Sequence, residues 1–264
     1  MHRHLFLIAA LCLASTTASA QMPDTVFLER LTWDEVRDSV AADKTTIIIP
    51  TGGTEQNGPH MALGKHNVRV ARNAEEIARR LGNALVGPVV AYTPEGGIDP
   101  PTGHMRFAGT ISIPEPIFRQ VLEYTARSLR QHGFRDIVFI GDSGPNQAPQ
   151  NAVAATLNAE WAGSNTRVHA IAGYYRADPE GDAQAMAAFG IRRDEIDNHA
   201  DVRDTSQMMA IDPTMVRNAK LQAGNGMNGI QGDPRRSTPE IGRVLNERNV
   251  SRTVDLISRS IAAR

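Results

Sequence analysis

The strongest constraint on the fold is the alternation of short apolar runs with segments of helical periodicity. The apolar runs, which are typical of strands buried on both faces, lie at residues 45–49, 85–92, 135–140 and 167–174. A capping box at Thr32 and Glu35 predicts a short helix to about residue 42, and apolar residues three or four positions apart predict helices over 68–81 and 117–129. Because strand–helix–strand units of this kind join parallel strands, the pattern predicts a layered α/β/α fold with a mainly parallel sheet.

The N-terminus has the composition of a secretory signal peptide. A basic start is followed by an apolar segment at 5–13, which is too short to cross a bilayer, and Ala20 is a small residue suited to cleavage. We therefore expect a signal peptide over 1–20, a single domain over 21–264, and an exported protein, periplasmic or secreted. Cleavage would remove Cys12, the only cysteine, and with it any thiolate chemistry.

The charge pattern limits the class of partner. The formal net charge is −1, and the 28 lysines and arginines form no cluster along the sequence. Binding to nucleic acid or to an anionic membrane depends on such clusters, so we expect neither. A small-molecule substrate is the partner that this composition favours.

Polar side chains follow the predicted strands at the point where each strand ends. They are Glu55, Asn57, His60 and His66; Asp142, Ser143 and Asn146; and Asp197, Asn198, His199 and Asp204. Ligands of open α/β sheets bind at the carboxyl ends of the strands, and imidazoles with carboxylates are typical ligands of divalent metals. The alternative is that each histidine is a structural or exposed residue without a chemical role.

Several motifs resemble those of the creatininase (creatinine amidohydrolase) family. Residues 55–60 read Glu-Gln-Asn-Gly-Pro-His where the family has Glu-Gln-His-Gly-Pro-His, and residues 107–112 read Phe-Ala-Gly-Thr-Ile-Ser where it has Phe-Pro-Gly-Thr-Ile-Ser. Weaker matches occur in the same order around residues 141–146, 199–206 and 232–242. The resemblance implies a creatininase-like α/β fold, a homo-oligomer (a hexamer), and a dinuclear Zn or Mn site that hydrolyses an amide-like C–N bond.

This sequence departs from the ligand pattern that the resemblance implies. Glu55 is kept, but Asn57 replaces the first histidine, His66 the bridging aspartate, and Ser143 the histidine of the third motif. Because an imidazole offers one lone pair to one metal, His66 cannot bridge two ions as a carboxylate does. We expect a mononuclear rather than a dinuclear site, with Zn or Mn held by Glu55, His66 and Asp142.

The resemblance also suggests catalytic and substrate-binding residues. His199 matches the proton-transfer histidine of the family, and Asp204 is placed to orient it. Asn57, His60 and His104 are candidate substrate contacts. The predicted function is an exported metal-dependent hydrolase of a cyclic amide, lactam or lactone; creatinine itself is disfavoured, because aromatic residues that stack on its ring are scarce (5% of the chain).

Two other functions remain open at this point. The loss of several metal ligands favours a non-catalytic small-molecule-binding protein that has kept the fold without its metals. The sequence Gly141-Asp142-Ser143, directly after a strand, resembles the nucleophile block of serine esterases, so Ser143 is a candidate nucleophile.

Overall fold

Parallel strands form one sheet in the computed structural model, which describes residues 22–175 and 178–263. Their order across the sheet is β2 (Ala84–Val86), β1 (Thr46–Thr51), β3 (Asp136–Gly141) and β4 (Arg167–Ala170). All neighbouring pairs run parallel, which confirms the predicted fold class. The signal peptide predicted at residues 1–20 lies outside the described residues, and the single domain over 21–264 stays a prediction.

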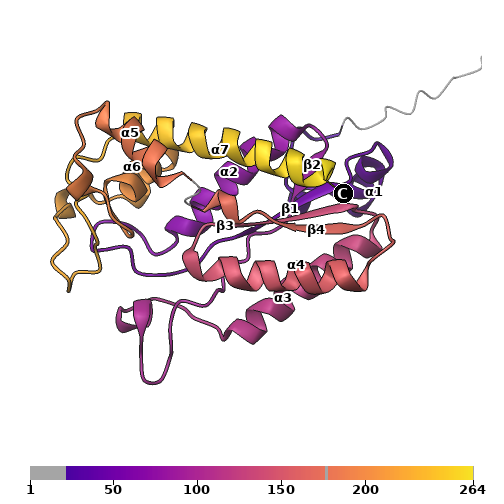
Figure 1. Ribbon diagram of the computed structural model, residues 1–264, viewed down its shortest axis with the longest axis horizontal. Coiled ribbons are helices and arrows are strands. Elements are labelled where there is room, and N and C mark those ends of the chain that lie inside the picture. Colours follow the sequence, from indigo (N-terminus) through magenta and orange to yellow (C-terminus); the bar gives the residue numbers. More distant parts are fainter. Residues whose placement is uncertain (1–21, 176–177, 264) are drawn as a thin grey trace, which may run out of the picture.

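Helices cover both faces of the sheet (Figure 1). On one side lie α3 (Glu115–Gln131) and α4 (Gln147–Glu160), and on the other α2 (Lys65–Leu81) and α7 (Pro239–Ala262). The remaining α-helices are α1 (Trp33–Ala41), α5 (Pro179–Ala187) and α6 (Val202–Ile211). In the described part of the chain, no helix combines the length and the hydropathy needed to cross a membrane.

The two faces of the sheet are buried by alternate residues of each strand. In β1, Ile47 and Ile49 pack with the apolar side chains of α3 and α4, whereas Ile48 packs with those of α2 and α7. All three are at most 1% exposed. This period of two explains why the strands appear in the sequence as continuous apolar runs.

Two of the predicted strands are shorter in the structure. β2 ends at Val86, because Gly87 and Pro88 follow and proline has no N–H to contribute to a ladder. β4 ends at Ala170, where a short 3-10 helix begins two residues later. The long loop predicted after the second strand is present and carries a 3-10 helix, Gly103–Arg106. That turn places His104 over the carboxyl edge of the sheet.

Candidate functional site

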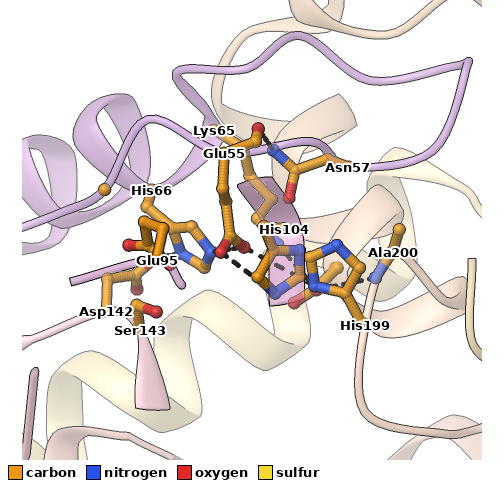
Figure 2. Close-up of polar contacts among 12 residues, drawn as sticks. Glu55, Asn57, Lys65, His66, Glu95, His104, Asp142, Ser143, His199 and Ala200 are labelled. Carbon is orange, nitrogen blue, oxygen red and sulfur yellow. Dashed lines mark hydrogen bonds and ion pairs between the residues drawn. The ribbon is translucent and has the colours of Figure 1, made fainter. Parts of the chain in front are cut away.

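A buried polar site lies beyond the carboxyl ends of β1 and β3 (Figure 2). Glu55 comes from the loop after β1, His66 from the first turn of α2, and Asp142 directly follows β3. These residues are 2%, 3% and 2% exposed. The sheet edge therefore brings together three side chains that the sequence placed at strand ends.

His66 lies between two carboxylates. Its Nε2 is 2.7 Å from Glu55 Oε1, and its Nδ1 is 2.7 Å from Asp142 Oδ2. Burial opposes ionisation of Glu55, but the charge and hydrogen bond of His66, together with Glu95 and Lys65, outweigh it and hold the pKa of Glu55 well below its usual value. The pKa of Asp142 is also lowered, because Arg69 and His66 together outweigh its burial. Each ring nitrogen of His66 is thus within hydrogen-bond distance of one carboxylate oxygen.

This arrangement uses both ring nitrogens of His66. The metal-ligand role predicted for Glu55, His66 and Asp142 as a set stays a prediction, since His66 would first have to give up one of these hydrogen bonds. In this structure His66 holds the two carboxylates in place through its two ring nitrogens.

The first turns of α2 supply two buried cations. Arg69 bonds Asp142 and Asp204 at 2.9 Å each, and Lys65 Nζ donates to Asp204 at 2.9 Å. Lys65 is 0% exposed and Arg69 5%. Lys65 and Arg69 thus face the carboxylates of Asp142 and Asp204, as buried charges require.

Two histidines approach Glu55 from the other side (Figure 2). His104 Nε2 is 3.3 Å from Glu55 Oε2, and His199 Nδ1 is 3.6 Å from Glu55 Oε1. One ligand atom from each of the three residues lies within 4.8 Å of the other two. Carboxylate oxygens and imidazole nitrogens are usual ligands of zinc. The donor types suit one divalent metal, and the ligand atoms lie close enough together to share it.

The protonation of these histidines also suits a metal. Burial lowers the pKa of His199 to about 3 and lowers the pKa of His104. Both rings are therefore neutral near pH 7, as metal ligation requires. His199 Nε2 donates to the main-chain carbonyl of Gln56 at 2.8 Å, which leaves the lone pair of Nδ1 directed at Glu55.

A second buried carboxyl, Glu95, contacts Glu55. Burial, followed by its hydrogen bond to Glu55 and the charge of Glu55, raises the pKa of Glu95 to about 10. Glu95 is thus a carboxylic acid that donates to Glu55, while its Oε1 accepts from Thr93 Oγ1 at 2.7 Å. The sequence analysis missed Glu95, because the loop that folds it back onto the sheet edge has no regular periodicity.

Replacing Glu95 with glutamine is expected to stabilise the metal-free chain progressively as pH rises. Glutamine reproduces the protonated carboxyl: its oxygen accepts from Thr93 and its amide donates to Glu55. In the wild type the folded state keeps a proton that the unfolded state loses near pH 4.5, so its stability falls as pH rises from 4.5 towards 10. The difference in the free energy of unfolding between Glu95→Gln and the wild type should grow by at most about 1.4 kcal/mol per pH unit.

Urea unfolding at several pH values between 5 and 9 measures this difference. Glu29→Gln, at an exposed carboxylate, is the control and should leave the pH dependence unchanged. A Glu95→Gln stability curve parallel to that of the wild type would contradict the assignment of a neutral Glu95.

The site opens into a cavity of about 200 Å³. His104, His199 and Ser143 line it, together with Tyr175, Asn198 and Gln231. Within residues 22–175 and 178–263, no side chain makes a hydrogen bond to Ser143 Oγ, so no histidine is in place there to act as its base.

Two predicted substrate contacts do not line this cavity. Asn57 is 0% exposed, and its amide donates to the carbonyls of Glu55 and Ala62. His60 is also fully buried, with Nε2 2.9 Å from Thr205 Oγ1. Both residues hold the motif loop in shape, whereas His104, the third predicted contact, does line the cavity.

The orientation of His199 has a different origin from the one expected. Asp204 was predicted to fix this ring, but the carbonyl of Gln56 makes the hydrogen bond to Nε2. Asp204 accepts instead from Lys65, Arg69 and the main-chain N–H of Ala200. Its part in the site is to balance the buried cations of α2.

The chain is similar to known proteins both in sequence and in structure. Residues 29–257 match the family model Creatininase, described as creatinine amidohydrolase. A mycofactocin precursor peptide peptidase of Mycobacterium ulcerans (strain Agy99) is 27% identical over 81% of this chain and 85% of its own. A creatinine amidohydrolase of Pseudomonas putida is 30% identical over 45% of each chain. A crystal structure of creatinine amidohydrolase (creatininase) has a TM-score of 0.72 at 21% identity, covering 90% of this chain and 99% of that one.

Fold and site together define an α/β protein with a carboxylate–histidine centre at the carboxyl edge of its sheet. The chain belongs to the creatininase family of hydrolases, since the family model covers most of its length. The family resemblance found in the sequence is thereby confirmed. Solved creatininases include a manganese form and a two-zinc form, so members of this family bind such metals.

Proposed function

We propose that this chain is a hydrolase that binds one divalent metal through Glu55, His104 and His199 and cleaves a C–N or C–O bond of a small cyclic amide, lactam or lactone. The observation that carries the proposal is the meeting of an ionised carboxylate with two neutral imidazoles whose ligand atoms lie within 4.8 Å of one another. Zinc and manganese both suit such a donor set.

The surrounding residues would prepare this centre for catalysis. A divalent metal supplies Lewis-acid polarisation of the scissile carbonyl and activation of a water molecule. His66 and Glu95 hold the Glu55 carboxylate from behind, as groups around metal ligands commonly do. Ser143 and Asn198, on the cavity wall, would hydrogen bond to the substrate.

The cavity supports a small polar substrate. Its volume of about 200 Å³ suits a compact ring, and polar and charged side chains make up most of its wall. The signal peptide predicted in the sequence would place the reaction outside the cytoplasm. A homo-oligomer of six chains is part of the same proposal, which light scattering of the purified protein would test.

Activity assays of the zinc-loaded and the metal-free protein on a panel of lactams, lactones and dipeptides test the proposal. Hydrolysis is expected only with metal, and His199→Ala should reduce it at least about 100-fold, since removing a ligand exceeds the 10–100-fold effect of groups behind the ligands. His132→Ala is the matched control, because His132 is exposed and precedes β3 at the opposite end of the sheet. An equal loss of activity in His199→Ala and His132→Ala would contradict the assignment of His199 to the metal site.

Ser143→Ala separates the serine mechanism from the metal mechanism. Activity that survives this change and needs metal supports the proposal. Activity that persists without metal and disappears with Ser143 would establish the esterase-like mechanism instead. Binding of these compounds without turnover or metal uptake would identify a non-catalytic small-molecule-binding protein.

A further inference from the structure

We propose that a small cavity beside the proposed metal site binds a small monovalent anion, such as chloride, through the guanidinium group of Arg203 and the side-chain amide of Asn249. Neither residue is among the proposed metal ligands, and the inference needs neither the metal nor the hydrolase activity. It gives a role to a buried arginine that the proposed function does not use.

The cavity lies where α6 packs along α7, near the first turns of α2 (Figure 1). Its volume is about 30 Å³, and its wall carries three arginines, Arg69, Arg203 and Arg252. Since one water molecule needs roughly 10–15 Å³, the cavity has room for a single small ion. Arg69, Tyr175 and Asp204 also line the cavity of the proposed metal site, so the two cavities share a wall.

Arg203 is a buried cation with little direct compensation. It is 7% exposed, and its one hydrogen bond in the described part of the chain runs from Nη2 to the main-chain carbonyl of Asp197, at 3.4 Å. No carboxylate oxygen of the described residues lies within 4.0 Å of its nitrogens. Burial opposes its charge, but Asp201 and Asp204 act from farther away and raise the pKa of Arg203, which stays a cation. Since buried donors are normally satisfied, Arg203 lacks acceptors.

Two further residues on the cavity wall, Asn249 and Arg252, come from α7. Arg252 Nη2 donates to Asn249 Oδ1 at 3.3 Å, and because a guanidinium cannot accept, the amide oxygen must face Arg252. Among the described residues nothing accepts from the remaining NH₂ group, although Asn249 is only 9% exposed. The Nη1 of Arg252 is 4.0 Å from Asp182 Oδ1, and its Nε has no partner there. The wall therefore offers donors and positive charge, and it lacks acceptors.

The carboxylates on the same wall are already paired. Asp142 and Asp204 each bond Arg69 at 2.9 Å, and Asp182 bonds Arg248 at 3.1 Å. Their charges are therefore compensated without Arg203. A water molecule in the cavity would supply an acceptor but no negative charge, whereas an anion supplies both, and hydrogen bonds between charged groups are the stronger ones.

Urea unfolding at increasing chloride concentration tests the inference, with gluconate, which is too large for the cavity, replacing chloride at constant ionic strength. A ligand of the folded chain raises the equilibrium constant for folding, by up to about tenfold for each tenfold rise of its concentration above the Kd. We expect this rise in the wild type and in Arg243→Met, which removes an exposed arginine of α7. Arg203→Met should show no such rise.

Asn249→Asp is a second variant, of unchanged shape, for the case in which Arg203→Met does not fold. Its carboxylate keeps the contact with Arg252 and adds a fixed negative charge to the cavity wall, so its stability should not depend on chloride. Crystals of the wild type soaked in bromide show the site directly, and we expect one anomalous bromide peak within hydrogen-bonding distance of Arg203. The same chloride dependence in every chain, no chloride dependence in the wild type, or only water in the cavity after soaking would overturn the inference.

Discussion

Arg69→Met is expected to be less stable than the wild-type chain by about 3–5 kcal/mol, the usual effect of removing one partner of a buried ion pair. Arg69 is buried and bonds Asp142 and Asp204 at the same time. Methionine fills a similar volume but leaves two carboxylates with one compensating charge fewer. Urea unfolding at pH 7 measures the loss.

Arg72→Met provides the matched control on the same helix. The Arg72 side chain is 50% exposed and pairs with Glu75 and Glu76 at the surface. Exposed pairs of this kind contribute about 0–1 kcal/mol. Arg69→Lys, which keeps the charge but loses the two-sided contact, should fall between the two. A similar stability for Arg69→Met and Arg72→Met would show that the buried network does not hold the site together.

Glu55→Gln is expected to lower zinc affinity at least about 100-fold, more than the loss of a group behind a ligand. The change keeps the shape of the side chain but removes the negative charge between the two histidines. It also leaves His66 with one ionised partner, Asp142. Zinc titration of the metal-free protein measures the effect.

Glu95→Gln is the control for this substitution, because it alters a neighbouring buried carboxyl that is already neutral. Its zinc affinity should stay within a few-fold of the wild type. Equal weakening by both substitutions would mean that buried charge in general, and not ligation by Glu55, determines metal binding.

The sequence predicted the layered fold well because burial on both faces of a parallel sheet leaves long apolar runs. The predicted second strand, residues 85–92, extends beyond the observed end of β2 at Val86. Gly87 and Pro88 end the strand, although Val89 and Val90 continue the apolar pattern. Helix α2 also begins earlier than its apolar periodicity indicates, at Lys65. Its first turns are polar because their side chains face the site.

The candidate site was predictable only in part. Strand ends identified Glu55, His66 and Asp142 as neighbours, because parallel strands end at one edge of the sheet. The sequence did not predict which of these residues bond to each other, because the ion pairs of His66 depend on where α2 begins. The approach of His104 to Glu55 depends on the path of a long loop.

The most direct test of the metal site is anomalous diffraction from crystals of the zinc-loaded protein, recorded on both sides of the zinc absorption edge. We predict a single anomalous peak per chain, within bonding distance of Glu55, His104 and His199, with His66 still between Glu55 and Asp142. A zinc ion bound by His66 and Asp142, two zinc ions in the site, or no zinc after loading would contradict the proposed metal site.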